Sequence, residues 1–419
     1  MMLLSRPQTS NFSLHRTKLA SFLGLLLTAS LANVSSAYAG NAVVNDYGDP
    51  NAARLWRQLA ALERKESSEV VHIMQLGDSH TGGDYFTQAY REQMQKRFGN
   101  AGIGWLSPGY IKNQRSAQVL MRMSGNWKTR ISRQNPENFP LGGFANQADP
   151  GSAIEIVPKQ PLFGLQRVTI WTRRLNDESS GGWKLSFPDG EVRELNAPLS
   201  NNWQASYVMG SALDLNSFTL RAENNPPELG AIIIDTLSPG VTVDSLGIVG
   251  ATQRVIARWQ TEAVREQLQW RRPSLIVLAY GTNEAFDPNP DFDSYKLELQ
   301  NTIRQLRAAA PEAAVLIIGA PNSAKKTGAG ENVGCRYRLP AGLKTVQNIQ
   351  QDIAISEHTL YWSWEAAMGG RCSMQRFVAA NPPLGRPDYV HFTEEGYAQG
   401  GNAFYEALMA RYHKNRPKR

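Results

Sequence analysis

The chain has 419 residues, of which 42% are hydrophobic and 19% charged, and this length is enough for two folded domains. Its formal net charge of +7 arises from 44 Lys and Arg against 37 Asp and Glu. The excess is mild and forms no long basic run, so composition does not indicate nucleic acid as a partner. It is compatible with work beside anionic polymers such as cell walls.

Residues 1–39 have the pattern of a secretion signal. A basic stretch without acids precedes the apolar run Leu19–Ala32, and Ala37-Tyr38-Ala39 has the small residues of a cleavage site. The alternative is a transmembrane anchor, but this run is too short to span a bilayer comfortably, and no later segment is apolar enough to do so. We therefore expect an exported mature chain that begins at Gly40.

The next segment, 40–115, predicts the first part of an α/β domain. Val70–Leu76 is an apolar run typical of a buried strand, and Tyr85–Phe98 has the periodicity of a helix.

Residues 116–238 break this alternation. They contain short β-like runs separated by turn residues, with no helical pattern between them. The runs are Ala153–Val157, Arg167–Trp171, Trp183–Phe187, Trp203–Val208, Phe218–Arg221 and Ala231–Asp235. Such spacing favours an all-β module, a β-sandwich or jelly roll, inserted into the α/β domain.

The α/β pattern returns in residues 239–419. The expected strands are Ser274–Tyr280, Ala314–Ile318 and Thr359–Trp362, and the expected helices are Tyr295–Ala309, Leu343–Glu357 and Glu394–Tyr412. Thr393 is the expected N-cap of the last helix. Alternation of this kind predicts a parallel sheet with helices on both faces, a three-layer sandwich.

The two cysteines of the chain, Cys335 and Cys372, are expected to form a disulfide, because an exported chain with a single pair favours that state. A reactive thiol is the alternative. Neither cysteine has the basic, histidine-containing surroundings in sequence that activate a thiol.

Three short segments provide what acyl transfer through a serine requires. Gly77-Asp78-Ser79-His80 follows the first strand, Gly281-Thr282-Asn283 follows the strand Ser274–Tyr280, and Asp388-Tyr389-Val390-His391 precedes the last helix. Side chains at the carboxyl ends of parallel strands face the ligand crevice of an open α/β sheet. Ser79 is thus a candidate nucleophile, Asn283 a candidate oxyanion donor, and His391 a candidate base oriented by Asp388.

Each segment also has a plainer interpretation. Ser79 could serve only as a helix N-cap, Asn283 as a turn residue, and Asp388 with His391 as a solvated turn that enters a helix. A metal site at Asp78, His80, Asp388 and His391 is a further alternative, but the spacing that metal ligands usually show is missing. The occurrence of all three segments in one chain favours the catalytic interpretation.

Together these segments resemble the blocks of the SGNH, or GDSL-type, hydrolases. The resemblance covers about 40–115 and 240–413, and it is strongest to the peptidoglycan O-acetylesterases of Gram-negative bacteria. Ser79-His80-Thr81, the run Tyr280 to Ala285 and the inserted β-segment match that group. The nucleophile-elbow sequence Gly-x-Ser-x-Gly of ordinary α/β-hydrolases occurs nowhere in the chain.

The resemblance implies a catalytic triad of Ser79, Asp388 and His391. It also implies an oxyanion hole from the Ser79 and Gly250 N–H groups and the Asn283 amide, with Gly247 as the alternative to Gly250. It implies no metal or organic cofactor, and an acetylated glycan as partner, with O-acetylated peptidoglycan expected. It also implies a periplasmic location, free or membrane-associated. The inserted segment would look like a carbohydrate-binding module, and its Trp127, Trp171, Trp183 and Trp203 could stack on sugars or fill its core.

Three other functions stay open at this point. The same triad could transfer acetyl groups to another glycan hydroxyl, or could deacetylate a different polysaccharide. The chain could also be a glycan-binding protein with an inactive hydrolase core. The sequence does not determine the oligomeric state.

Overall fold

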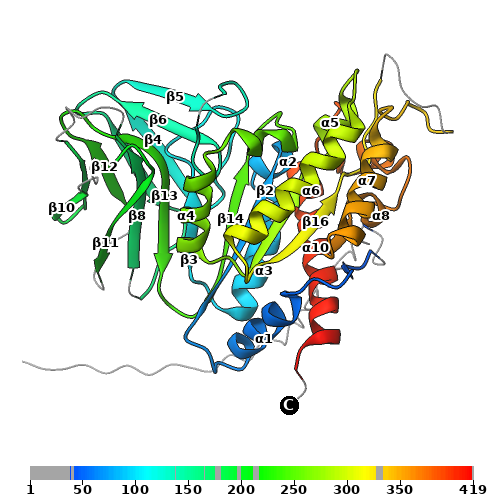
Figure 1. The fold of residues 1–419 in the computed structure, drawn as a ribbon, viewed down its shortest axis with the longest axis horizontal. Helices are drawn as coiled ribbons and strands as arrows, with labels where there is room; N and C mark the ends of the chain where they lie inside the picture. The colour runs from blue at the N-terminus through cyan, green and yellow to red at the C-terminus, as the bar shows by residue number, and fades with distance from the viewer. Residues whose placement is uncertain are drawn as a thin grey trace, which may run out of the picture. The chain divides into compact units, whose positions relative to one another are not determined.

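The structure is a computed structural model that describes residues 38, 42–136, 138–164, 166–174, 181–195, 200–210, 217–326 and 334–417. The expected signal segment 1–39 lies outside the described residues, apart from Tyr38. Figure 1 gives the order of the helices and strands along the chain.

A six-stranded sheet forms the centre of the α/β part. Its order is β1 (Asn45–Asp46), β17 (Leu360–Ser363), β16 (Ala314–Gly319), β15 (Leu275–Ala279), β2 (Val70–Gly77) and β14 (Gly240–Gly247). All neighbours pair in parallel except the short edge strand β1, which is antiparallel to β17. The strands are apolar on both faces, as parallel strands covered on both sides must be.

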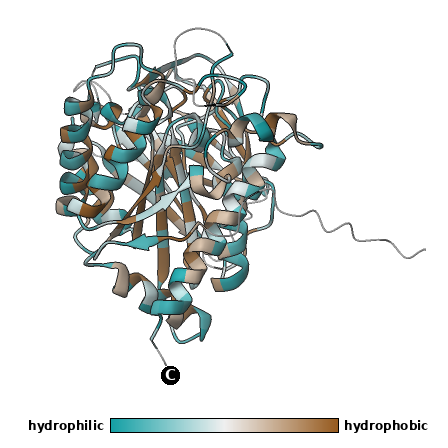
Figure 2. Ribbon diagram, turned by 90° about the vertical axis from the view of Figure 1, so that its right-hand side faces the viewer, coloured by the Kyte–Doolittle hydropathy of each residue, from teal (hydrophilic) through white to brown (hydrophobic). Residues whose placement is uncertain are grey.

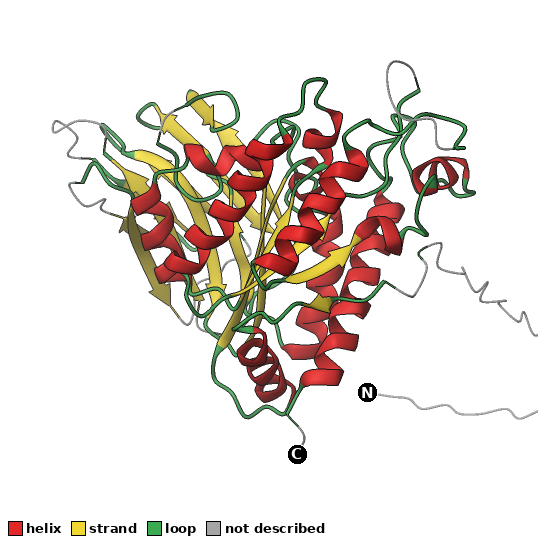
Figure 3. Ribbon diagram, turned by 45° about the vertical axis from the view of Figure 1, so that its right-hand side comes forward, coloured by secondary structure: helices red, strands yellow, loops and turns green. Residues whose placement is uncertain are grey.

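Helices cover both faces of this sheet (Figure 3). One face packs against α1 (Ala52–Glu63), α3 (Tyr85–Phe98), α8 (Trp364–Ala367), α9 (Ser373–Ala379) and α10 (Glu394–Asn415). The other packs against the 3-10 helix η1 (Gln253–Arg258), α4 (Thr261–Arg271), α6 (Phe292–Ala309) and α7 (Leu343–Ser356). Side chains of β2 point alternately to the two faces of the sheet. Val71 and Ile73 pack with the first group of helices, and Met74 and Leu76 pack with the second. Figure 2 shows hydrophobic residues along the central strands and both hydrophilic and hydrophobic residues on the helices around them.

The all-β part consists of two antiparallel sheets. One has the order β10 (Val192–Leu195), β9 (Trp183–Ser186), β12 (Phe218–Ala222), β7 (Ala153–Pro158) and β4 (Val119–Ser124). The other has the order β11 (Gln204–Gly210), β8 (Gln166–Arg173), β13 (Glu228–Thr236), β6 (Phe144–Ala148) and β5 (Trp127–Ile131), with β3 (Gly102–Leu106) also paired to β13. The two sheets enclose a core of residues such as Ile154, Ile170 and Leu220. The expected fold class, a three-layer α/β sandwich with an inserted β-sandwich, is confirmed.

The β-sandwich is joined to the α/β part through a continuous core. Trp171, Trp203 and Ile233 of the module belong to the same buried cluster as Ile276 of the central sheet. The antiparallel pairing of the module already includes β3, ahead of the boundary expected at residue 116. Point substitutions are therefore better probes of the module than its excision, since excision would expose this core.

A buried ion-pair network crosses the same junction. Arg271, at the end of α4, donates to Asp235 of β13 at 2.9 Å and to Asp244 of β14 at 2.7 and 2.8 Å. All three side chains are almost fully buried. Removing one partner of such a buried network is strongly destabilising, typically by about 3–5 kcal/mol.

The tryptophans of the module are mostly core residues. Trp183 and Trp203 are fully buried, and Trp171 is 4% exposed, so these three rings are not available to stack on a sugar. Trp127 is half-buried and stacks on Trp183, with 5.8 Å between the ring centroids. The glycan-stacking interpretation of the three buried tryptophans is wrong, because their rings fill hydrophobic cores and cannot reach a ligand in solvent.

Tyr38 is part of the folded core. Its side chain is 3% exposed, donates to the Gly396 carbonyl at 3.1 Å and packs edge-on against Phe377. Cleavage after Ala39, which the signal pattern predicts, would remove this side chain from the core. No helix in the described part of the chain is both long and apolar enough to cross a membrane.

Candidate active site

Ser79 lies where β2 turns into a short helix, α2 (Ser79–Gly82). The turn is tight because Gly77 has no side chain: a Cβ atom there would lie 2.1 Å from the Thr81 hydroxyl oxygen. Asp78 caps the helix, since its carboxylate accepts the His80 N–H at 2.9 Å. The N-cap is therefore Asp78, and the Ser79 hydroxyl is not used for capping.

The three expected triad residues lie in one hydrogen-bonded chain. Ser79 Oγ is 2.9 Å from His391 Nε2, although the two residues are 312 positions apart in sequence. His391 Nδ1 is 2.9 Å from Asp388 Oδ2. The His391 side chain is 33% exposed and that of Asp388 48%, so a substrate can reach the histidine from solvent.

The Asp388 carboxylate is fixed by its own loop. Its other oxygen, Oδ1, accepts the N–H groups of Val390 and His391, each at 2.9 Å. Tyr389 has a φ of +61°, and this left-handed residue lets the chain curl back over the carboxylate. Partial burial would raise the pKa of Asp388, but the two N–H groups and the His391 ring outweigh it and lower the pKa, so the group is an anion at neutral pH.

Asn283 and Gly250 lie on two loops that contact each other. Asn283 is in α5 (Thr282–Phe286), directly after β15, and its side-chain amide donates to the Ala251 carbonyl at 2.8 Å. This bond uses one of the two amide hydrogens and leaves the second for a ligand. Gly250 is exposed, with a φ of +74°, in the turn that the Ala251 N–H closes onto the Ile248 carbonyl.

Gly247 is placed differently from Gly250. It pairs with Gly77 at the ends of β14 and β2, and a Cβ atom there would lie 2.0 Å from the Gly82 nitrogen. Gly247 thus allows α2 to pack against the sheet from behind. This position does not suit an oxyanion donor, and it favours Gly250 over Gly247.

Glu284 is a residue of the site that motif analysis did not single out. Its buried carboxylate accepts the Gln253 N–H at 2.7 Å and the Gly281 N–H at 3.0 Å. It thereby ties the loop that follows Gly250 to the loop that carries Asn283. Only its position directly after Asn283 could have drawn attention to it, because the sequence does not show which backbone groups it meets.

Two buried groups lie behind the nucleophile. Burial lowers the pKa of His80 well below its usual value, so its ring is neutral, and Nδ1 lies 2.9 Å from the Tyr397 hydroxyl. Burial raises the pKa of Asp78 to about 7, and the nearby Glu284 contributes to this rise. Within the described ranges, no group of three or more His, Cys, Asp or Glu side chains is arranged to hold a metal ion.

A disulfide bond lies near the Asp388–His391 loop. Cys335 and Cys372 are bonded, with their Cα atoms 5.6 Å apart. Tyr337, two residues after Cys335, packs edge-on against Tyr389 of the loop at 4.7 Å between ring centroids. The covalent link therefore connects α9 to a segment that contacts the loop carrying His391.

Comparison with known proteins finds two matching family profiles and one similar solved structure. The profile of a family described as peptidoglycan O-acetylesterase, N-terminal, matches residues 101–215, and that of the GDSL-like lipase/acylhydrolase family matches residues 210–399. A solved structure titled "Peptidoglycan O-acetylesterase in action, 5 min" is 32% identical, covers 88% of this chain and 99% of its own, and superposes with a TM-score of 0.76. No curated protein sequence matches.

More distant structures are also found. An acetyl xylan esterase is 15% identical over 40% of this chain and 80% of its own, with a TM-score of 0.29. A family two carbohydrate esterase from Clostridium thermocellum is 9% identical over 69% of this chain and 99% of its own, with a TM-score of 0.30. Neither carries weight for this chain at such scores.

The fold and the site define a GDSL-type acylhydrolase, a carboxylic ester hydrolase. Within that class, the chain belongs to the peptidoglycan O-acetylesterase family.

Proposed function

We propose that this protein is a serine esterase that removes O-acetyl groups from the 6-hydroxyl of muramic acid in peptidoglycan. The observation that carries the proposal is the continuous chain from Ser79 Oγ through the His391 ring to Asp388, with both links at 2.9 Å. Membership of the family supports the substrate.

The geometry suggests two half-reactions. His391 Nε2 takes the Ser79 proton as Oγ attacks the acetyl carbonyl carbon. The bond to the sugar oxygen then breaks, His391 gives that oxygen the proton, and an acetyl group stays on Ser79. Water, deprotonated by His391, attacks this ester and releases acetate. Asp388 holds the His391 tautomer and stabilises the positive charge that forms on the ring.

The oxyanion would meet three donors. Ser79 is the first residue of α2, where backbone N–H groups have no acceptor within the helix. The Gly250 N–H is in the exposed turn beside Ala251, and the Asn283 amide, which donates one hydrogen to the Ala251 carbonyl, has a second hydrogen to donate. A single such donor is typically responsible for about 3–4 kcal/mol of transition-state stabilisation.

The test is acetate release from O-acetylated peptidoglycan and from acetylated xylan, measured side by side with wild type, Ser79→Ala and Asp388→Asn. We expect release from peptidoglycan, none from Ser79→Ala, and a loss of about 10⁴-fold in Asp388→Asn. Asp352→Asn, on the exposed surface of α7, is the matched control. A Ser79→Ala protein with a tenth of wild-type activity would disprove the triad assignment. Faster acetyl transfer to added chito-oligosaccharide than to water would identify a transferase.

We also propose that the protein is exported and works in the periplasm, with residues 40–115 and 239–419 as the catalytic domain and the inserted β-module positioning the glycan. The signal-like pattern of residues 1–39 and the single disulfide support export. N-terminal sequencing of the protein recovered from the periplasm tests it, and uncleaved protein in the cytosol would contradict it.

A further inference from the structure

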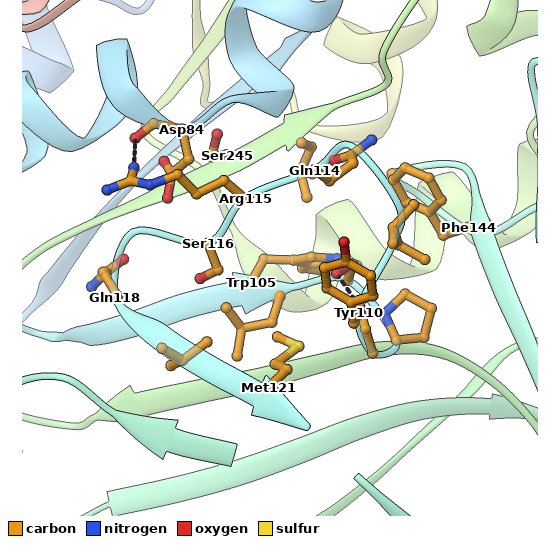
Figure 4. Close-up of a pocket in the computed structure, with 18 of the residues that line it drawn as sticks. Asp84, Trp105, Tyr110, Gln114, Arg115, Ser116, Gln118, Met121, Phe144 and Ser245 are labelled. Atoms are coloured by element: carbon orange, nitrogen blue, oxygen red, sulfur yellow. Dashed lines mark hydrogen bonds between the residues drawn. The ribbon is translucent and has the colours of Figure 1, made fainter. Parts of the chain in front are cut away.

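The β-module contacts two segments of the candidate active site, the helix α2 and the turn that carries Gly250. The loop between β3 and β4 reaches α2, where the Arg115 N–H donates to the Gly82 carbonyl at 3.1 Å. The same loop lines a pocket of about 310 Å³ together with β14 and the start of α3 (Figure 4). The turn after β5, residues 132–135, lies against Gly250. The two contacts differ in whether their charged side chains are free to bind a ligand.

The charged side chains of the pocket already have partners within the protein. Arg91 and Arg115 both donate to Asp84, at 2.8 and 3.4 Å. Lys159 has Asp84 and Glu394 among its electrostatic partners. The charges of this pocket are therefore largely compensated, and they do not indicate a charged ligand.

Arg133, in the turn after β5, is different. Its side chain is exposed, and the hydrogen bonds and ion pairs among the described residues give its guanidinium no partner. The side chain lies along Gly250, because a Cβ atom built on Gly250 would be 3.6 Å from Arg133 Nε and 3.7 Å from its Cζ. These are van der Waals contact distances, so a free guanidinium lies directly beside a candidate oxyanion donor.

The backbone of Arg133 is held by the segment that follows Gly250. Arg258, at the end of η1, donates through Nη1 to the carbonyl oxygens of Ser132 and Arg133 at 2.8 and 2.7 Å. The Trp259 ring N–H donates to the Ser132 hydroxyl at 3.2 Å. The point from which the Arg133 side chain extends is therefore fixed relative to the Gly250 turn.

The chemistry of a guanidinium at this place suits an oxygen-rich ligand. It has several N–H donors in one plane and no acceptor. Ser79 lies at the end of a buried strand, so a sugar whose acetyl carbonyl oxygen meets the Gly250 N–H must extend towards solvent. The ring oxygen and the neighbouring oxygen of such a sugar are only a few bonds from the ester oxygen. They come within reach of Arg133, which is exposed beside Gly250.

We propose that Arg133 of the β-module is a substrate-binding residue that donates hydrogen bonds to oxygen atoms of the sugar that carries the acetyl ester. The inference rests on the proposed function for the reaction, whereas the contact with the sugar does not depend on which polymer the sugar belongs to. The β-module thus contributes a side chain directly to the active site.

The test compares an acetylated sugar with an ester that contains no sugar. Hydrolysis of 6-O-acetyl-N-acetylglucosamine and of p-nitrophenyl acetate is measured for wild type and Arg133→Ala. We expect Arg133→Ala to raise KM for the acetylated sugar, so that its kcat/KM falls about tenfold more than that for p-nitrophenyl acetate. Arg133→Lys, which keeps a charged donor, should recover part of this loss. Arg122→Ala is the matched control, because this exposed arginine of β4 pairs with Glu155 within the module.

Two results would overturn the proposal. An equal loss of kcat/KM on the two esters would show that Arg133 acts on the oxyanion or on the fold and not on the sugar. An Arg133→Ala protein with the same kcat/KM for the acetylated sugar as the Arg122→Ala control would show that Arg133 does not bind it. If wild type hydrolysed the acetylated sugar with the expected dependence on Arg133 but released no acetate from O-acetylated peptidoglycan, the proposal would stand and the proposed function would fail, so the two failures are distinguishable.

Discussion

Substitution of Glu284 by Gln tests whether a buried carboxylate holds the proposed oxyanion hole together. In the structure its two oxygens accept the Gln253 and Gly281 N–H groups at 2.7 and 3.0 Å. Glutamine has the same length but only one acceptor oxygen, so one of these N–H groups would face an amide N–H₂. One loop must then move away, and the Asn283–Ala251 bond joins the same two loops.

The expected magnitude follows from the lost bond. A hydrogen bond to a charged group contributes about 1.5–3 kcal/mol, and a tenfold change in rate corresponds to about 1.4 kcal/mol. If the displacement of Asn283 and Gly250 costs about 2 kcal/mol of transition-state stabilisation, kcat falls about 30-fold. KM should change little, because the oxyanion exists only after attack.

The assay is steady-state hydrolysis of p-nitrophenyl acetate by purified Glu284→Gln, with circular dichroism to check that the variant is folded. Glu262→Gln is the matched control, since this glutamate of α4 pairs with Arg265 at the surface and its carboxylate does not contact the two loop N–H groups. A folded Glu284→Gln variant with wild-type kcat would refute the reasoning. An effect on KM alone would show that Glu284 acts in substrate binding.

Three further substitutions have defined outcomes. Asn283→Ala should lower kcat by about 10²–10³-fold with little change in KM, and a change in KM alone would make Asn283 a substrate-binding residue. Burial raises the pKa of Asp78 from 3.8 to about 7, so the stability due to this carboxyl is full below about pH 4 and is lost as pH rises through 7. The free energy of unfolding measured in urea should therefore fall by about 3–4 kcal/mol more between these pH values in wild type than in Asp78→Asn. An equal dependence on pH in the two proteins would contradict the assignment. Replacing Cys335 and Cys372 by Ser opens a link across 37 positions and should lower the free energy of unfolding by up to about 4 kcal/mol, whereas an unchanged urea midpoint would show that the bond contributes nothing.

Much of the fold could be predicted because its signals are local. The buried strands Val70–Leu76 and Ala314–Ile318 are apolar on both faces, and the helix that begins after Thr393 has its cap in the sequence, where the Thr393 hydroxyl accepts the Gly396 N–H at 3.2 Å. The boundary of the β-module could not be predicted in this way. The pairing of β3 with β13 joins residues more than a hundred positions apart, and no local pattern shows which strand lies beside which.

The candidate site divides in the same way. The order of strand and turn places Ser79 and Asn283 at the carboxyl ends of neighbouring strands, β2 and β15, so their approach follows from the parallel sheet. The surroundings of Gly247 and Gly250 did not follow, because both glycines lie in one short run and differ only in what packs against them. The burial of Trp171, Trp183 and Trp203 was equally undetermined, since a tryptophan in a β-strand can face either the core or the solvent.

The sequence by itself determined the chemistry available to this protein: a serine, an amide and a histidine with its acid, each at the end of a strand or the start of a helix. Only the tertiary structure decided how these groups are held, through the Glu284 carboxylate between two loops and the left-handed Tyr389 over Asp388. It also decided that the β-module shares a core with the catalytic sheet, because Trp171 and Trp203 of the module lie in one buried cluster with Ile276 of the sheet. The physical reason is that residue type and local periodicity are properties of short segments, whereas hydrogen-bond partners and burial depend on contacts between segments far apart in the chain.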